Sequence, residues 1–313
     1  MNKPTTINKF TAHGKFLITG EYAVLDNVSA LAIPLKLNQY LEVSPRNDQV
    51  ITWKSYDYDG DLWFETQFAV EELIDRSKIK FDDEVQEKLI LILRFAIWLN
   101  PLALSKIDSG LDAVTTLDFN RKYGMGTSST LISLVSQWLE CDPFALQFEC
   151  FGGSGYDIAC ATAKRALIYN YNDAQPTVEL IDWNPIIMES IFFVYLNRKQ
   201  NSRDSIARFD NSLITDKVRK ELDEMPQRFM DASDDLTAFN MVINRHEAII
   251  FSLIGLEPVK QKLFPDYTQA IKSLGGWGGD FVMCTGGIEE RAYFKSKGFE
   301  IVLEWDEVSA SLS

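Results

Sequence analysis

The chain has 313 residues, 46% of them apolar and 24% charged, and its formal net charge at pH 7 is −14 because 45 Asp and Glu outnumber 31 Lys and Arg. The length predicts two closely packed lobes, and the acidic balance argues against nucleic acids and anionic membranes as partners, since both favour clustered basic residues. We expect a cytoplasmic protein, because the first residues lack the apolar core of a signal peptide and the longest apolar stretch is short and interrupted by Arg94.

The first half of the chain alternates between apolar runs typical of strands and helically spaced apolar positions. In chain order, the predicted elements are strands over 16–18, 31–43, 50–53 and 62–70, a helix over 84–99, a strand over 111–119, helices over 131–139 and about 143–150, and a strand over 167–171. Pro101 ends the helix over 84–99. Glycine-rich turns separate the later elements.

The second half has a different pattern, which begins near residue 182. Its predicted elements are a strand over 191–196, two or three helices within about 204–256, a helix over about 267–273, a strand over 281–284, a helix over 288–297 and a strand over 299–304. Together, the elements of the two halves predict an α+β protein of two lobes, 1–182 and 183–313.

The segment KYGMGTSST has the shape of a phosphate-binding turn at a helix N-terminus. Gly124 and Gly126 allow close backbone approach, and Thr127, Ser128 and Ser129 supply hydroxyls where the helix begins. Those hydroxyls could equally be plain helix caps. The spacing fits neither GxxxxGK[ST] nor GxGxxG, so P-loop and dinucleotide-binding proteins are excluded.

Two other segments carry charged residues beside glycines. In GGSGYDIA, Asp157 follows a glycine turn, either as a helix-start acid or as a carboxylate beside a phosphate site. In HGKFLITGEYAVL, Lys15 and Glu21 flank a short apolar run, for which a surface charge pair is the simplest explanation. The segment GGWGGD alone predicts only a tight turn before a strand.

The order of these motifs resembles the GHMP kinase superfamily. GKFLITGEYAVL, KYGMGTSS, GSGYD and KSLGGWGGD occur in the family's order between Gly14 and Asp280, and they are most similar to the motifs of phosphomevalonate kinases. GYDIA is also similar to a branch of the family named for that string. The resemblance implies an N-terminal lobe (1–182) that has a left-handed β-α-β crossover and the ATP, magnesium and catalytic motifs. The C-terminal lobe (183–313) would be ferredoxin-like and hold the third glycine motif.

The resemblance also assigns roles to single residues. Lys15 matches the family's active-site lysine near the reacting hydroxyl, and Asp157 matches a catalytic base or orienting carboxylate. Ser128 is the position expected to hold Mg²⁺, and Glu149 is a candidate second ligand. The positions expected to bind ATP phosphates are Lys122, Gly124, Gly126, Thr127, Ser128 and Ser129. The positions expected to contact the acceptor are Glu21, Gly155, Gly275, Gly276, Trp277, Gly278 and Gly279.

Trp277 departs most from the family pattern, which has glycine there. Its indole either lines the acceptor pocket, which would favour a smaller acceptor, or packs away from the pocket inside the C-terminal lobe.

The resemblance implies an ATP- and Mg²⁺-dependent kinase of the mevalonate route to isoprenoids, with a small alcohol or phosphate acceptor. Phosphomevalonate is the first choice of acceptor and mevalonate the second. The alternatives are diphosphomevalonate decarboxylase, a lyase on the same fold, and a GHMP-fold binding protein without activity. The expected partner is the small-molecule acceptor, with no nucleic acid and no membrane, and a homodimer is allowed for.

Overall fold

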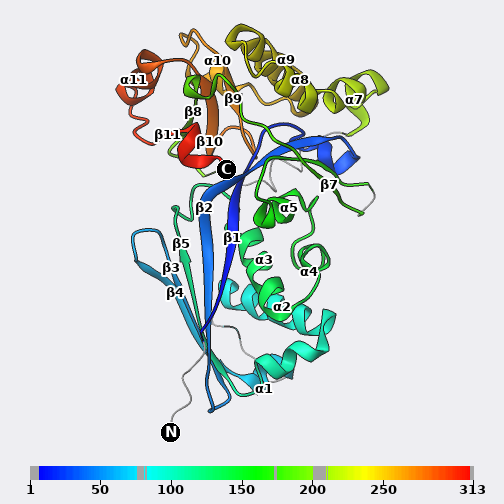
Figure 1. Cartoon of the computed structure of the whole chain (residues 1–313), viewed down its shortest axis with the longest axis vertical. Coiled ribbons are helices and arrows are strands. Elements are labelled where there is room, and N and C mark those ends of the chain that lie inside the picture. The colour runs from blue at the N-terminus through cyan, green and yellow to red at the C-terminus, as the bar shows by residue number, and fades with distance from the viewer. Residues whose placement is uncertain are drawn as a thin grey trace. The chain divides into compact units, whose positions relative to one another are not determined.

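The computed structural model describes residues 7–75, 81, 83–172, 175–199, 209 and 211–310 (Figure 1). The chain forms two compact units that interleave along the sequence. Unit 1 comprises Met1–Gly14, Leu37–Arg121 and Gly126–Thr162, and unit 2 comprises Lys15–Lys36, Lys122–Met125 and Ala163–Ser313. A single cut at residue 182 therefore does not separate them, because two early segments of the chain belong with the C-terminal part.

Unit 1 contains a mixed sheet. Its strands are the start of β1 (Asn8–Leu17), the second half of β2 (Ala30–Pro45), β3 (Val50–Tyr56), β4 (Leu62–Ala69) and β5 (Leu111–Leu117). β5 pairs antiparallel with β2 and parallel with β3, and β4 pairs antiparallel with β3. Along β3 every second residue is buried, which is the alternation expected of a strand with one face on the core.

The helices of unit 1 lie on one side of these strands (Figure 1). They are α1 (Val70–Ile74), α2 (Glu84–Leu99), the short 3₁₀ segment Pro101–Lys106, α3 (Thr127–Leu139), α4 (Pro143–Cys150) and α5 (Tyr156–Thr162). The Asp83 side chain caps α2 by accepting from the N–H groups of Val85 and Gln86. One apolar core joins the helices to the sheet, with Trp53 and Trp138 among its largest members.

Unit 2 contains two sheet regions. The first half of β2 pairs with β6 (Leu167–Asn170), which pairs with β7 (Thr177–Leu180). A separate antiparallel sheet has the order β11 (Val302–Glu304), β8 (Ile191–Tyr195), β10 (Phe281–Thr285), β9 (Ile271–Ser273), so that β9 is an edge strand. The helices are α7 (Asp216–Asp223), α8 (Met225–Asp231), α9 (Leu236–Ile254), α10 (Val259–Leu263), α11 (Ile288–Ser296) and α12 (Trp305–Val308), with 3₁₀ turns at Ala23–Asp26, Met188–Ser190 and Asn211–Leu213.

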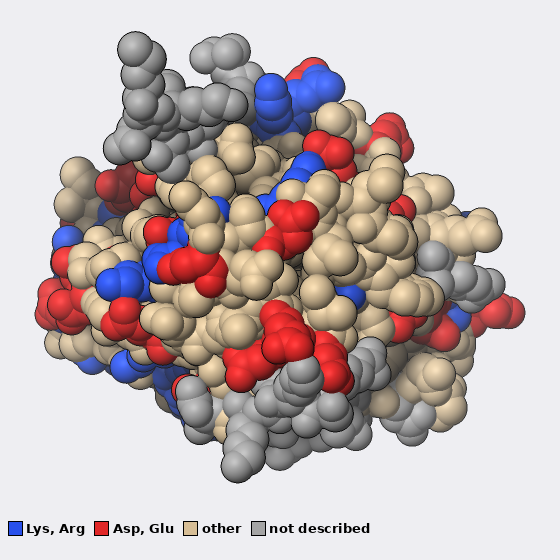
Figure 2. All heavy atoms as spheres, turned by 90° about the horizontal axis from the view of Figure 1, so that it is seen from below, with Lys and Arg blue, Asp and Glu red and all other residues tan. Residues whose placement is uncertain are grey.

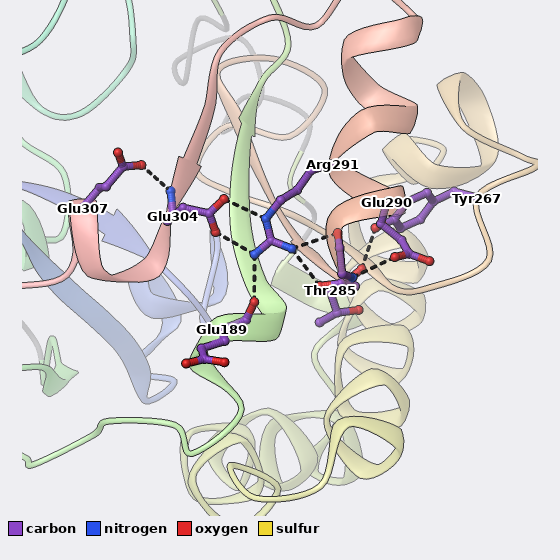
Figure 3. Close-up of polar contacts among 9 residues, drawn as sticks. Glu189, Tyr267, Thr285, Glu290, Arg291, Glu304 and Glu307 are labelled. Carbon is purple, nitrogen blue, oxygen red and sulfur yellow. Dashed lines mark hydrogen bonds and ion pairs between the residues drawn. The ribbon is translucent and has the colours of Figure 1, made fainter.

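Arg291 on α11 holds several segments of unit 2 together (Figure 3). Its guanidinium donates to both carboxylate oxygens of Glu304, at 2.7 and 2.6 Å, and to the backbone carbonyls of residues 286–287 and Glu189, at 2.8–2.9 Å. It also lies 4.5 Å from the ring centroid of Phe192. Bidentate pairing and stacking of this kind are specific to Arg, so Lys would not replace it.

Most predicted elements are confirmed, including the α+β class, the helix over 84–99 and the strand over 281–284. The helix predicted over 267–273 is wrong, because Ile271–Ser273 forms strand β9, paired with β10. The preceding residues form no helix either, and the Tyr267 hydroxyl donates to the Thr285 carbonyl at 2.5 Å. Of the helical region predicted within 204–256, residues 204–208 and 210 lie outside the described part.

The surface agrees with the acidic composition. On the face drawn in Figure 2, Lys and Arg side chains are interspersed with Asp and Glu, and no continuous basic area is seen among the described residues. In the described parts of the chain, no helix combines the length and the apolar character needed to cross a bilayer.

Candidate functional site

The turn before α3 leaves the start of this helix without a side-chain cap. Gly126 is the residue before the helix, with φ of +98°, and it carries no side chain that could cap the N–H groups of the first turn. Thr130 N–H, which donates to the Gly126 carbonyl, is the first that the helix itself can satisfy. The N–H groups of Thr127, Ser128 and Ser129 therefore point out of the helix end, where the helix dipole favours an anion.

The hydroxyls at this helix start fall into two kinds. Ser129 and Thr130 are buried: the Ser129 hydroxyl donates to the Gly126 carbonyl at 2.8 Å, and the Thr130 hydroxyl makes its shortest contact, 2.5 Å, with the side-chain oxygen of Gln39. Thr127 is half-buried and Ser128 is exposed. The Ser129 hydroxyl therefore donates to the backbone, so Ser129 can contribute only its N–H group to a ligand. Thr127 and Ser128 can contribute hydroxyls as well.

Lys15 lies against residues 122–125 within unit 2. Its backbone N–H donates to the Met125 carbonyl at 3.0 Å, and its ammonium lies 3.4 Å from the Gly124 carbonyl. Tyr123 packs its ring on Tyr195, with the centroids 4.7 Å apart. The hydroxyl of Tyr195 lies 3.5 Å from the carbonyl of Lys122, whose own side chain is exposed. These contacts hold the glycine turn next to the predicted catalytic lysine. They account for the position of Lys15 without the charge pair to Glu21 that the spacing of the two residues suggests.

Asp280, the last residue of the third glycine motif, packs against the same turn. A Cβ on Gly124 would lie 2.4 Å from the Asp280 carboxylate, and Gly124 has φ of +69°, so only glycine fits here. The backbone of Asp280 is held by the N–H of Leu196 and the carbonyl of Arg198, at 2.8 and 2.7 Å. The sequence reasoning did not single out Asp280, although the GGD string contains it.

The other predicted groups of unit 1 lie on α4 and α5. Asp157 is half-buried in the first turn of α5 and lies two residues after Gly155, which is buried and has φ of +84°. Glu149 is exposed near the end of α4. No cluster of three or more His, Cys, Asp or Glu suited to a metal is found among the described residues.

The donor types nevertheless fit a nucleotide and Mg²⁺. Outward N–H groups and hydroxyls at the α3 start suit phosphate oxygens. Ser128 and Glu149 carry oxygen ligands of the kind that Mg²⁺ prefers, and this ion commonly takes only one or two protein ligands.

Glu21 is fully buried in a cluster of charged and polar side chains inside unit 2. We call the group made of Glu21, His246, Glu247, Lys272 and Ser273 the buried charge cluster. One Glu21 carboxylate oxygen accepts a short hydrogen bond from the Lys272 ammonium, and the other lies 3.2 Å from Nε2 of His246. Glu247 accepts from the Ser273 N–H and hydroxyl, at 3.0 and 2.9 Å.

Burial dominates the protonation of this cluster. It raises the pKa of Glu21, an effect that the Lys272 charge opposes, and it raises the pKa of Glu247 to about 7. It lowers the pKa of His246 well below its usual value, with a further lowering by Lys272, so His246 is neutral. Sequence reasoning missed this cluster because its members are far apart in the chain.

The third glycine motif forms the loop between β9 and β10. Gly275 and Gly278 are half-buried with positive φ, and a Cβ on either would meet nothing within 4 Å. Gly276 and Gly279 are buried. Trp277 is 1% exposed and belongs to an apolar cluster with Tyr22, Met225 and residues of α9. The environment of the indole therefore agrees with the alternative in which Trp277 packs inside the C-terminal lobe.

No model of a known protein family and no curated protein matches the sequence. The fold is nevertheless shared with solved structures. The mevalonate kinase of Methanococcus jannaschii aligns with a TM-score of 0.67 at 16% identity, over 96% of this chain and 97% of that one.

Two further similar structures are kinases with other acceptors. The Streptococcus pneumoniae phosphomevalonate kinase in complex with phosphomevalonate and AMPPNP aligns with a TM-score of 0.69 at 13% identity, over 95% of this chain and 99% of that one. The Lactococcus lactis galactokinase complexed with galactose aligns with a TM-score of 0.65 at 13% identity, over 95% and 93% of the two chains. Identities of this size establish the architecture, and the chain has the fold of the GHMP kinases that its ordered motifs resemble.

Proposed function

We propose that the chain is an ATP- and Mg²⁺-dependent small-molecule kinase, with phosphomevalonate as the first-choice acceptor and mevalonate as the second. The observation that carries the proposal is the glycine turn 124–126, which has the Lys15 ammonium on the carbonyl of Gly124 and leads into the uncapped helix α3. The shared fold with a phosphomevalonate kinase complex that contains AMPPNP supports both the nucleotide and the acceptor class.

Phosphoryl transfer asks a protein chiefly for positioning and for neutralisation of charge. In the proposed reaction an acceptor oxygen forms a bond to the γ-phosphorus of ATP, the bond to the β,γ-bridging oxygen breaks, and ADP leaves. The N–H groups of Thr127, Ser128 and Ser129 bind phosphate oxygens, and the Lys15 ammonium offsets the negative charge that is greatest in the transition state. Asp157 orients the acceptor and takes the proton when the acceptor is a hydroxyl.

Mg²⁺ would be held by Ser128, with Glu149 as a second ligand. When bound, it would offset the negative charge of the phosphates. Lys122 contributes a further positive charge near the turn, because its exposed side chain belongs to the same segment as Gly124.

The surroundings of Trp277 and Glu21 bear on the acceptor. The packing of the indole in an apolar cluster supports the packing alternative for Trp277, which gives no reason to prefer the smaller acceptor, so phosphomevalonate stays our first choice. The buried carboxylate of Glu21 is occupied by Lys272, which favours an indirect role for Glu21 in acceptor binding. The backbone of Gly155, Gly275, Gly276, Gly278 and Gly279 remains the proposed contact surface.

An ADP-release assay with mevalonate, phosphomevalonate, diphosphomevalonate, galactose and homoserine, each with and without Mg²⁺, tests the proposal. We expect Mg²⁺-dependent ADP release with phosphomevalonate or mevalonate. Release of CO₂ and inorganic phosphate together with ADP from diphosphomevalonate would establish the lyase instead. Nucleotide binding without turnover of any acceptor would establish an inactive binding protein.

A further inference from the structure

The third glycine loop, residues 274–280, is held at its C-terminal end by backbone bonds of Asp280 to Leu196 and Arg198, whereas its N-terminal end is held less firmly. β9, which leads into it, has three residues and pairs only with β10, because it is the edge strand of its sheet. The next backbone bond, from Leu274 N–H to the Phe281 carbonyl, is 3.3 Å long. An edge strand this short does not by itself fix the N-terminal end of the loop, so side chains beside β9 supply restraint there, in addition to the packing of Trp277 within the loop.

The buried charge cluster supplies contacts at this place. The Lys272 ammonium lies between two carboxylates, in direct contact with Glu21 and 3.6 Å from Glu247. It also donates to the Ser273 carbonyl at 2.7 Å. Glu247 on α9 binds both the N–H and the hydroxyl of Ser273, on the side of β9 that has no neighbouring strand.

We propose that Lys272 is a positioning residue that connects the third glycine loop to the segment HGKFLITGEYAVL, which contains Glu21. Its partner Glu21 directly follows Gly20 and precedes the 3₁₀ turn Ala23–Asp26, so the ion pair joins segments 251 residues apart in the chain. Glu247 fixes the adjacent Ser273 to α9, and the two carboxylates together hold both residues that precede the loop.

The charges in the buried charge cluster explain why Lys272, and no other member of the cluster, has this role. A fully buried ammonium is tolerated only when it is paired and its protons are bonded. Here Lys272 is the cation between the two carboxylates, because the neighbouring His246 is neutral. Removing Lys272 alone leaves the carboxylates of Glu21 and Glu247 buried without a counter-charge. Removing the Glu21 charge as well leaves only the carboxylate of Glu247 in that state.

Hydrogen exchange measured peptide by peptide tests the proposal without relying on activity. In Lys272→Met, amides of residues 274–280 should exchange on the order of tenfold faster than in the wild type, because local opening of the loop becomes easier. Amides of α3, in unit 1, should be unchanged. Lys297→Met is the matched control, since it removes an exposed ion pair with Asp266 in the same unit and should leave the loop unchanged.

The double variant Glu21→Gln/Lys272→Met decides the case if the single variant does not fold. It lacks the ion pair between Lys272 and Glu21 but carries less unpaired buried charge, so it should melt at a higher temperature than Lys272→Met and still show the faster loop exchange. Wild-type exchange of residues 274–280 in either folded variant would overturn the proposal.

A kinetic measurement connects the ion pair between Lys272 and Glu21 to the proposed function, and this kinetic prediction rests on that function. Lys272→Met or the double variant should raise KM for the acceptor or lower kcat by about tenfold, while the Kd of the nucleotide, which α3 binds, changes by less than about twofold. A parallel loss of nucleotide binding would show a general structural role and contradict the proposal. If the wild type itself transfers no phosphate, the proposed function fails, and the exchange experiment still decides the role of Lys272.

Discussion

Replacing Trp277 by glycine tests how the third glycine loop is packed. The indole is 1% exposed inside an apolar cluster, and truncating a buried Trp typically costs about 3–5 kcal/mol. Two smaller effects oppose this loss. Trp277 has φ of +52°, a conformation that costs a non-glycine residue about 1 kcal/mol. Its indole N–H is buried without a hydrogen-bond partner among the described residues, which costs about 1 kcal/mol more.

The sum predicts that Trp277→Gly lowers the free energy of unfolding by about 1–3 kcal/mol. Denaturant unfolding measures it, with Trp277→Phe as the matched control. Phe keeps most of the buried ring surface and the left-handed strain but removes the N–H, so this variant should lose less than about 1.5 kcal/mol.

The same two variants distinguish a Trp277 ring that packs in the apolar cluster from one that lines the acceptor pocket. If the ring only packs, the ratio of kcat/KM for phosphomevalonate to that for mevalonate should stay within about threefold of the wild type. An unchanged unfolding free energy together with a shift of about 10–200-fold in this ratio would refute the packing argument and place the ring in the acceptor pocket.

Four further changes test the proposed machinery. Asp157→Asn should lower kcat by about 10²–10⁴-fold while leaving the Kd of ATP nearly intact, and a near-normal kcat in the folded variant would remove this residue from the mechanism. Lys15→Met should also lower kcat in steady-state assays, because it deletes a charge needed most in the transition state, and an unchanged rate would contradict this role. Ser128→Ala should weaken the Mg²⁺ dependence of nucleotide-induced thermal stabilisation, whereas Ser129→Ala, whose hydroxyl donates to Gly126, should not, and equal effects would argue against the division of hydroxyls described above. Glu247 has a folded-state pKa raised to about 7 from 4.5, so its contribution to stability is fully present below pH 4.5 and is lost as pH rises to about 7. Glu247→Gln should therefore flatten this part of the unfolding free energy plotted against pH, and an unchanged slope would contradict the assignment.

Local chemistry made the end of one helix and the start of another predictable from the sequence. Pro101 ends a helically spaced apolar run, and the structure ends α2 at Leu99. The glycine turn before Thr127 similarly predicted that a helix begins there, because glycine conformations depend only on neighbouring residues. Anion binding at this helix start stays a prediction.

Features that depend on distant residues were not predictable. Residues 267–273 have a helical pattern, yet Ile271–Ser273 pairs with β10, since strand pairing overrides local propensity. Lys15 and Glu21 are close in sequence, but Glu21 pairs with Lys272 instead. A spacing pattern in one sequence contains no information on such a partner, so the buried charge cluster became visible only in three dimensions.

We propose that the chain transfers a phosphoryl group from ATP to a small acceptor. ³¹P NMR of a reaction containing the protein, ATP, Mg²⁺ and phosphomevalonate, with Asp157→Asn as the control, tests this activity. We expect the wild type to convert the phosphomonoester signal into the paired signals of a diphosphate as ADP accumulates, and the variant to do so far more slowly. Unchanged phosphomevalonate and mevalonate in matched reactions, with ATP bound but intact, would contradict it.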